Sequence, residues 1–176
     1  MLYFAVMRGR AAFRAILITA LALAAASVLS ALDDDDSPEP APRFHAKTTA
    51  GETFNNESIK GKVVLLEFWT TWCPYCKDEQ GLVDGIGQEF ADKGLIVLAV
   101  DVLEPKKTVK KYLQEHPRSC RIVLTEDTNL AAMYQANSYP IYVVIDRDGN
   151  VAGTQRGAAG ERGIRRLLRL AGLESE

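Results

Sequence analysis

Residues 62–76, KVVLLEFWTTWCPYC, join an apolar run to two cysteines that are separated by two residues. Apart from one lysine and one glutamate, the first eight residues are apolar, and a run of this kind predicts a strand that is buried on both faces. Pro74 suits the first turn of a helix, because the N–H that proline lacks needs no partner there. The stretch therefore predicts a buried strand, a turn and a helix that starts at Cys73 or Pro74 and reaches about Asp92.

Strand and helix patterns alternate along the rest of the chain. Residues 43–55 predict a β-hairpin with its turn near Ala50–Gly51, and Asp148–Gly149 is a strong hairpin sequence between the last two strands. Further strands are predicted at 95–102, 121–124, 141–146 and 150–155, and further helices at 105–116, 128–136 and 160–171. This order predicts an α/β fold with a central mixed sheet, helices on both faces and an N-terminal β-hairpin.

Composition narrows the class of protein. Apolar residues make up 47% of the 176-residue chain, which is enough for a packed core, and the formal net charge of −2 argues against a nucleic-acid partner. The three cysteines are too few for a disulfide scaffold. One close pair and one lone thiol, Cys120, favour redox chemistry instead.

The N-terminal 32 residues have the pattern of an export signal. Residues 1–14 carry three arginines and no acidic residue, and residues 15–32 carry no charge at all. An apolar run of ~18 residues is at the lower limit for spanning a bilayer, so a cleaved signal peptide and a signal anchor both stay open. Residues 33–42 (DDDDSPEPAP) predict an acidic, proline-rich linker, which leaves 43–176 as the folded domain. By the positive-inside rule we expect that domain outside the cytoplasm, periplasmic or otherwise extracytoplasmic, soluble or anchored.

The spacing of Cys73 and Cys76 places them one turn apart at the start of a helix. Backbone N–H groups and the positive end of the helix dipole favour thiolate at Cys73, and thiolate is the nucleophile of disulfide exchange. We therefore expect Cys73 to attack and Cys76 to resolve the mixed disulfide. Two alternatives use the same thiols. One is a zinc site, for which His45, His116 and Cys120 offer no ligand spacing, and the other is a Cu(I) carrier, since soft thiolates suit Cu(I).

Glu67 interrupts the apolar strand six residues before Cys73. A buried carboxyl group without a neighbouring cation has a raised pKa. We expect Glu67 to take the proton from Cys76 when that thiol attacks the mixed disulfide. Tyr139–Pro140 precedes the strand at 141–146, and exposed backbone at this point would offer a strand edge to a substrate chain.

These features resemble the thioredoxin superfamily, and within it the exported TlpA/ResA-like proteins. The resemblance rests on GKVVLLEFW, on W-C-x-x-C, on the aromatic–proline pair before IYVVIDRDGN and on the export segment, and it covers about residues 43–172. It implies a thioredoxin-like fold in which Pro140 is a cis-proline that faces the cysteines. It assigns catalysis and substrate binding to six residues: Cys73, Cys76, Glu67, Trp72, Tyr139 and Pro140.

The same resemblance implies a function. We expect an exported thiol–disulfide oxidoreductase that needs no cofactor and no metal, reduces disulfides of extracytoplasmic proteins such as apocytochrome c, and takes electrons from a DsbD/CcdA-like membrane protein.

Glu79 matches a glutamate that often follows the motif. Tyr75 departs from the pattern, since proline usually precedes the second cysteine. The superfamily includes peroxidases, but we do not assign their Thr-x-x-Cys site to Thr70–Cys73. For Cys120 we expect an inert buried thiol, with a regulatory cysteine as the alternative.

Overall fold

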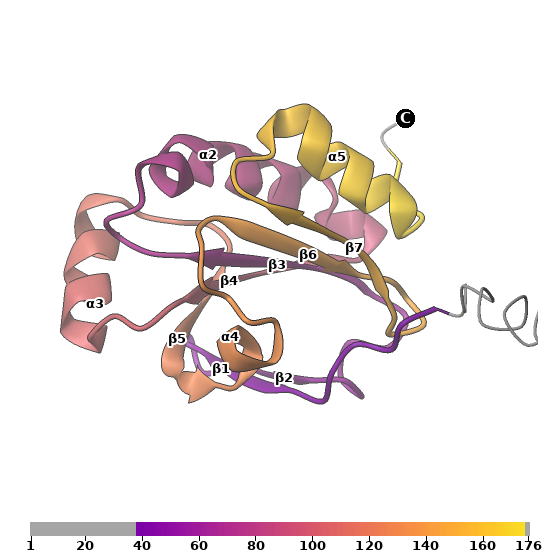
Figure 1. Cartoon of the computed structure of the whole chain (residues 1–176), viewed down its shortest axis with the longest axis horizontal. Coiled ribbons are helices and arrows are strands. Elements are labelled where there is room, and N and C mark those ends of the chain that lie inside the picture. The colour runs from indigo at the N-terminus through magenta and orange to yellow at the C-terminus, as the bar shows by residue number, and fades with distance from the viewer. Residues whose placement is uncertain (1–37, 175–176) are drawn as a thin grey trace, which may run out of the picture. The chain divides into compact units, whose positions relative to one another are not determined.

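A computed structural model describes residues 38–174, so the predicted export signal and the acidic run of the predicted linker lie outside the described residues. Residues 38–174 form a seven-stranded mixed sheet in the order β2-β1-β5-β4-β3-β6-β7, with helices on both faces (Figure 1). The predicted thioredoxin-like α/β class is confirmed. Within these residues no helix is long and apolar enough to cross a membrane.

The centre of the sheet is β3 (Val63–Trp69), which pairs in parallel with β4 (Leu95–Asp101) and antiparallel with β6 (Ile141–Ile145). All seven residues of β3 are buried, because the strand has a neighbour on each edge and helices above and below. Alternate residues face opposite sides of the sheet. Glu67 lies opposite Ala99 of β4 and Tyr142 of β6, in the middle of this buried row.

Within residues 38–174, three α-helices cover one face of the sheet and a fourth covers the other (Figure 1). The parallel strands β3, β4 and β5 are added in one direction, so right-handed crossovers put the two intervening helices on the same face. The chain then crosses back to β6 over the opposite face. The first face carries α2 (Pro74–Glu89), which the short 3₁₀ helix η2 (Ala91–Lys93) follows, α3 (Lys106–Glu115) and α5 (Gly160–Leu170), and the second carries α4 (Leu130–Met133).

The far edge of the sheet is formed by β1 (His45–Thr48) and β2 (Thr53–Asn55), which pair antiparallel around a turn at Gly51. Because β1 also pairs with β5 (Arg121–Thr128), these strands extend the main sheet. The predictions of a short strand at 121–124 and a helix at 128–136 were wrong at their boundaries. Pairing with β1 carries β5 on to Thr128, a long-range contact that no local pattern indicates.

The other edge of the sheet is β7 (Val151–Arg156), which pairs antiparallel with β6. In the turn between them the Asp146 carboxylate accepts hydrogen bonds from the N–H groups of Asp148 and Asn150. Backbone hydrogen bonds also tie Glu39 and Ala41, in the stretch predicted as a linker, to Val151 and Gly149.

Candidate active site

The two close cysteines lie at the carboxyl end of β3, where the chain turns into α2. Cys73 is the N-cap of α2 and Pro74 is in its first turn, which confirms the predicted start of the helix. Cys73 and Cys76 form a disulfide, and the Cys76 N–H donates a hydrogen bond to Cys73 Sγ at 3.1 Å. One sulfur therefore already accepts a hydrogen bond from the helix N-terminus, which is the contact that stabilises a thiolate there.

Both cysteines are buried, but two aromatic side chains close to them in the sequence are exposed. Cys76 is fully buried and Cys73 is 2% exposed, whereas Trp72 and Tyr75 are 65% and 62% exposed. The Trp72 ring meets the ring of Tyr139 edge-on at 5.8 Å, and the Tyr139–Pro140 peptide bond is cis. Since Tyr139 also packs against the cluster that holds both cysteines, the structure brings Trp72 and Tyr139 together beside the disulfide, and Pro140 follows Tyr139 in the chain.

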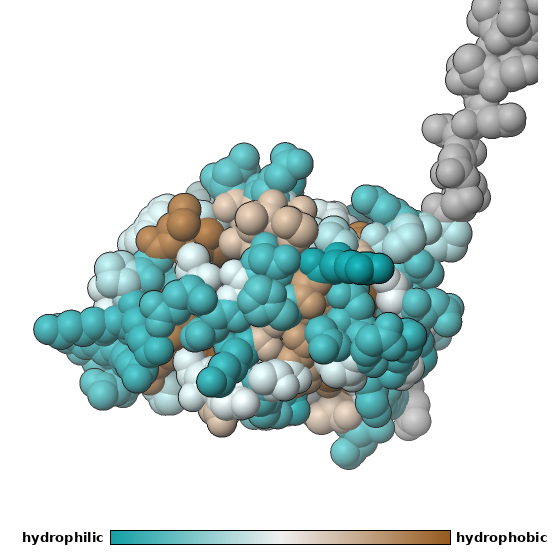
Figure 2. All heavy atoms as spheres, turned by 90° about the horizontal axis from the view of Figure 1, so that it is seen from below, coloured by the Kyte–Doolittle hydropathy of each residue, from teal (hydrophilic) through white to brown (hydrophobic). Residues whose placement is uncertain are grey.

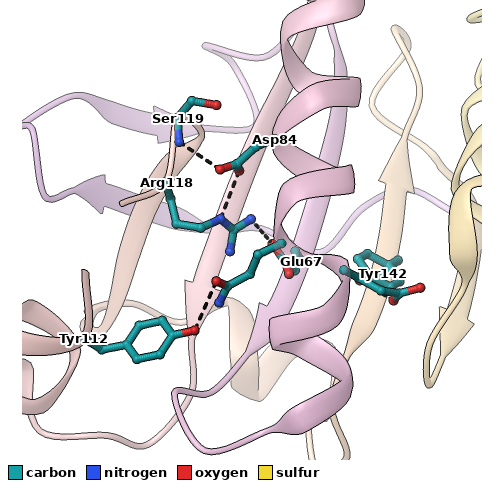
Figure 3. A network of polar contacts seen from close by, with 8 residues as sticks. Glu67, Asp84, Tyr112, Arg118, Ser119 and Tyr142 are labelled. Atoms are coloured by element: carbon teal, nitrogen blue, oxygen red, sulfur yellow. Dashed lines mark hydrogen bonds and ion pairs between the residues drawn. The ribbon is translucent and has the colours of Figure 1, made fainter. Parts of the chain in front are cut away.

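Glu67 is fully buried on the face of the sheet that α2 covers, and it has a cation beside it. Arg118 Nη2 lies 2.8 Å from Glu67 Oε2, and Arg118 Nε lies 3.0 Å from Asp84 Oδ1 of α2. The Ser119 N–H donates to the second oxygen of Asp84 at 2.9 Å (Figure 3). The prediction of a carboxyl group without a cation was therefore wrong. Arg118 is brought to Glu67 from 51 residues further along the chain, by the loop that precedes β5.

Opposing effects act on the proton affinity of Glu67. Burial raises its pKa, while the charge of Arg118 and the hydrogen bond from it work in the other direction, and the net pKa is raised. Arg118 occupies only Oε2. Among residues 38–174 no group donates a hydrogen bond to Oε1, which leaves this oxygen able to accept a proton.

The space between β3 and α2 links this carboxyl group to the resolving thiol. Trp69, two residues beyond Glu67 on the same face of β3, packs in one cluster with Cys76. The Arg118 guanidinium lies 5.8 Å from the centre of the Trp69 ring. Cys76 and Arg118, the ion-pair partner of Glu67, therefore both lie beside the Trp69 side chain.

Glu79 serves the framework of the site. It is 7% exposed and accepts hydrogen bonds from the Tyr142 hydroxyl at 2.8 Å and from the backbone N–H groups of Ala159 and Gly160. These contacts tie α2 to β6 and to the N-terminus of α5. Its carboxylate is thus committed to structural donors.

A second acidic pair borders the site and was missed by sequence reasoning. Glu104 accepts two hydrogen bonds from Thr71, one from its backbone N–H at 2.5 Å and one from its hydroxyl at 2.6 Å. Asp101, at the end of β4, is fully buried, and burial together with the nearby Glu104 raises its pKa to about 7. The only hint in the sequence is that two acids follow an apolar strand.

Cys120 is half-buried just before β5, and burial raises the pKa of its thiol far above that of a free cysteine. The thiol therefore stays protonated at neutral pH, which supports its interpretation as inert.

Disulfide exchange is the chemistry that a cysteine pair at a helix N-terminus performs. Proteins that carry such a pair on this fold are thioredoxin-like thiol–disulfide oxidoreductases, and this chain is one of them. Comparison with known families gives the particular group. Residues 38–154 match the AhpC/TSA family, and the chain belongs to it.

Relatives of known sequence and structure agree with this placement. Thiol-disulfide oxidoreductase ResA of Halalkalibacterium halodurans is 26% identical over 132 residues, which cover 75% of each chain. The thioredoxin-like protein YneN of Bacillus subtilis is 30% identical over 135 residues, 75% of this chain and 78% of YneN. A solved thiol:disulfide interchange protein of the thioredoxin family from Chlorobium tepidum has a TM-score of 0.66 and 28% identity, and the match covers 76% of this chain and 96% of that one. The predicted resemblance is confirmed.

Proposed function

We propose that this protein reduces disulfide bonds in proteins outside the cytoplasm, with Cys73 as nucleophile, Cys76 as resolving thiol and Glu67 as proton acceptor. The observation that carries the proposal is the position of Cys73 as the N-cap of α2, where its sulfur accepts a hydrogen bond from the Cys76 N–H. The carboxyl group of Glu67 is fully buried on the face of the sheet that α2 covers.

The reaction divides into two exchanges. In the first, the Cys73 thiolate attacks one sulfur of the substrate disulfide, a mixed disulfide forms, and the other substrate sulfur leaves as a thiolate that takes up a proton. In the second, Cys76 gives its proton to Glu67 and attacks Cys73 Sγ. The mixed disulfide breaks, and the remaining substrate sulfur leaves as a thiolate that takes up a proton. The substrate has then gained two electrons, and the protein has lost two electrons in forming the Cys73–Cys76 disulfide.

Cysteine variants test this order. Cys76→Ser should accumulate a mixed disulfide when it reacts with a peptide disulfide. Cys73→Ser should form a mixed disulfide much more slowly, because it lacks the nucleophile. Cys120→Ala should react like the unchanged protein. Alkylation of the reduced protein should label Cys73 first, with an apparent pKa below the ~8.5 of free cysteine. Faster labelling of Cys76 would reverse the assignment.

A matched pair of variants tests Glu67. Glu67→Gln should slow the second exchange by up to roughly 100-fold at pH 7, because it removes a proton acceptor and little volume. Asp84→Asn removes the same charge from the same ion-pair network but leaves Glu67 in place, so it should have a much smaller effect. If the second exchange had the same rate in both variants from pH 6 to 9, Glu67 would not be the proton acceptor.

The direction of electron flow follows from how well the reduced state is stabilised. The helix N-terminus stabilises the Cys73 thiolate, but Pro74 lacks one N–H, and an ionised Glu67 opposes a second negative charge nearby. We expect a potential between ~−270 mV and ~−120 mV, nearer the first value, which is that of thioredoxin. Equilibration against glutathione would measure it. A value near −120 mV would mean that the protein inserts disulfides.

Two partners complete the proposal. The electron donor is a DsbD/CcdA-like membrane protein, and the substrates are extracytoplasmic proteins, apocytochrome c among them; both rest on the resemblance to ResA-like proteins.

Export rests on the charge pattern of residues 1–32. Residues 1–42 fused to a reporter enzyme that is active only outside the cytoplasm should give activity. Tight binding of one Cu(I) by the reduced pair, without disulfide exchange, would favour the metal-carrier alternative.

A further inference from the structure

The connection between β4 and α3 contains a leucine in an unfavourable conformation. Leu103 has a φ of 58°, in the left-handed region that a Cβ disfavours, and its side chain is 81% exposed. Glycine would adopt this backbone more easily, and an exposed leucine gains little from hydrophobic burial. The requirements of the fold alone therefore do not explain a leucine at this position.

Hydrogen bonds hold this connection against the active site. The Leu103 N–H donates to Thr125 Oγ1 at 2.7 Å. On one side of Leu103, the Val102 N–H donates to the carbonyl oxygen of Trp69 at 3.1 Å. On the other side, Glu104 accepts the two hydrogen bonds from Thr71, two residues before Cys73. Leu103 is therefore fixed at the rim of the site.

Exposed apolar side chains are few in the domain. Figure 2 shows a face on which hydrophobic surface is confined to small areas among hydrophilic side chains. Within residues 38–174 the large exposed apolar side chains are Trp72, Tyr75, Leu103, Met133 and Leu170. The first two flank Cys73. Leu103 lies near them, because the carboxylate of the next residue, Glu104, accepts a hydrogen bond from Thr71, which precedes Trp72.

The aromatic pair Trp72 and Tyr139 lies near the connection that contains Leu103. Tyr139 contacts Trp72, and burial together with the nearby carboxyl groups of Asp101 and Glu104 raises the pKa of the Tyr139 hydroxyl. Since those two acids bracket Leu103 in sequence, the leucine lies in the same region as Trp72 and Tyr139, beside Cys73.

We propose that Leu103 is a specificity-determining residue, which packs against an apolar side chain of an extended polypeptide on the flank of the disulfide that Cys73 attacks. The inference rests on the proposed function. A polypeptide fits better than a small disulfide such as oxidised glutathione, because glutathione is charged and has no apolar side chain to place on the leucine. Tyr139 offers backbone for the same extended chain.

Three variants separate the side chain of Leu103 from its backbone. Leu103→Ala removes the side chain and keeps the left-handed conformation costly, whereas Leu103→Gly removes both the side chain and that cost. Leu170→Ala is the matched control, since Leu170 is 60% exposed but lies in the last turn of α5. The glycine variant should have the highest midpoint of thermal unfolding.

The assay is a single turnover of the reduced protein with excess disulfide, followed by tryptophan fluorescence. The probes are a disulfide-linked peptide dimer with leucine on either side of its cysteine, the same peptide with serine there, and oxidised glutathione. Both Leu103 variants should raise the half-saturating concentration of the leucine peptide about fivefold, the loss of one partly buried leucine contact, without a change in limiting rate. The serine peptide, glutathione and Leu170→Ala should show less than a twofold change.

Other outcomes overturn the inference. Unchanged half-saturation by the leucine peptide in both Leu103 variants would remove the proposed contact, and an effect of the glycine variant alone would assign it to the backbone conformation. If the unaltered protein reduced none of the three probes, the proposed function itself would fail.

Discussion

Replacing Arg118 with methionine tests the buried ion pair behind the cysteines. The Arg118 side chain is 1% exposed and that of Glu67 is 0% exposed, so neither has bulk water as a substitute partner. Methionine keeps most of the volume and removes the charge. Breaking a buried pair by removing one partner costs about 3–5 kcal/mol, because the other charge is left uncompensated. We expect Arg118→Met to lower the free energy of unfolding by this amount at pH 8.

The effect should depend on pH in a defined direction. Burial already raises the pKa of Glu67 above its ordinary 4.5, and loss of Arg118 raises it further. When the folded pKa of an acid is raised, the folded state binds the proton more tightly than the unfolded chain, so stability is greatest at low pH and falls as pH rises through the folded pKa. In Arg118→Met a larger share of the carboxyl group is neutral at pH 5 than at pH 8, because its pKa is raised. The destabilisation should therefore be smaller at pH 5.

Urea unfolding of the oxidised protein, followed by circular dichroism at both pH values, measures these differences. Arg121→Met is the matched control: Arg121 pairs with Glu52 but is 42% exposed, and exposed pairs contribute only ~0–1 kcal/mol. The double variant Glu67→Gln/Arg118→Met should recover part of the loss, since no unpaired charge remains at position 67. If Arg118→Met cost no more than Arg121→Met, or cost the same at both pH values, the buried pair would not have the energetic role assigned to it.

Three further predictions concern other parts of the site. Glu79→Gln should lower the free energy of unfolding by about 1–3 kcal/mol in urea titrations, because it weakens the contacts to Tyr142 and to the N-terminus of α5. Burial raises the pKa of Asp101 to about 7, so the protein should lose stability as pH rises from 5 to 8, and Asp101→Asn should flatten that decline in urea midpoints; an unchanged slope would contradict it. Cys120 in the folded, reduced protein should resist iodoacetamide at pH 8, and rapid labelling detected by mass spectrometry would show that burial does not protect it.

Local patterns in the sequence were sufficient for the centre of the fold. The apolar run before the cysteines predicted β3, and proline after Cys73 predicted the start of α2, because both depend on residues adjacent in the chain. The boundaries of β5 and α4 were wrong because β1, about 80 residues earlier in the chain, fixes them through long-range pairing. Pairing of this kind leaves no periodic trace in either segment.

The polar surroundings of the site could not be predicted for the same reason. Arg118 follows Pro117 in a loop, and nothing in its neighbourhood distinguishes it from a solvated arginine. Its position under α2 depends on how the loop before β5 folds over the sheet. Thr71 and Glu104 are likewise 33 residues apart and meet only because β3 and β4 end at the same edge of the sheet.

The buried arginine bears directly on how a carboxyl group can act as a base in an apolar interior. Without a cation, burial would hold Glu67 protonated, and a protonated carboxyl group cannot accept the Cys76 proton. Arg118 binds Oε2 and favours the ionised form, while Oε1 accepts no hydrogen bond from any group of residues 38–174. Transfer of the proton from Cys76 to Glu67 then moves a negative charge from oxygen to sulfur without changing the number of charges buried between β3 and α2. The step therefore avoids most of the cost of creating a new buried charge, and we infer that the ion pair with Arg118 is what makes Glu67 usable as a proton acceptor.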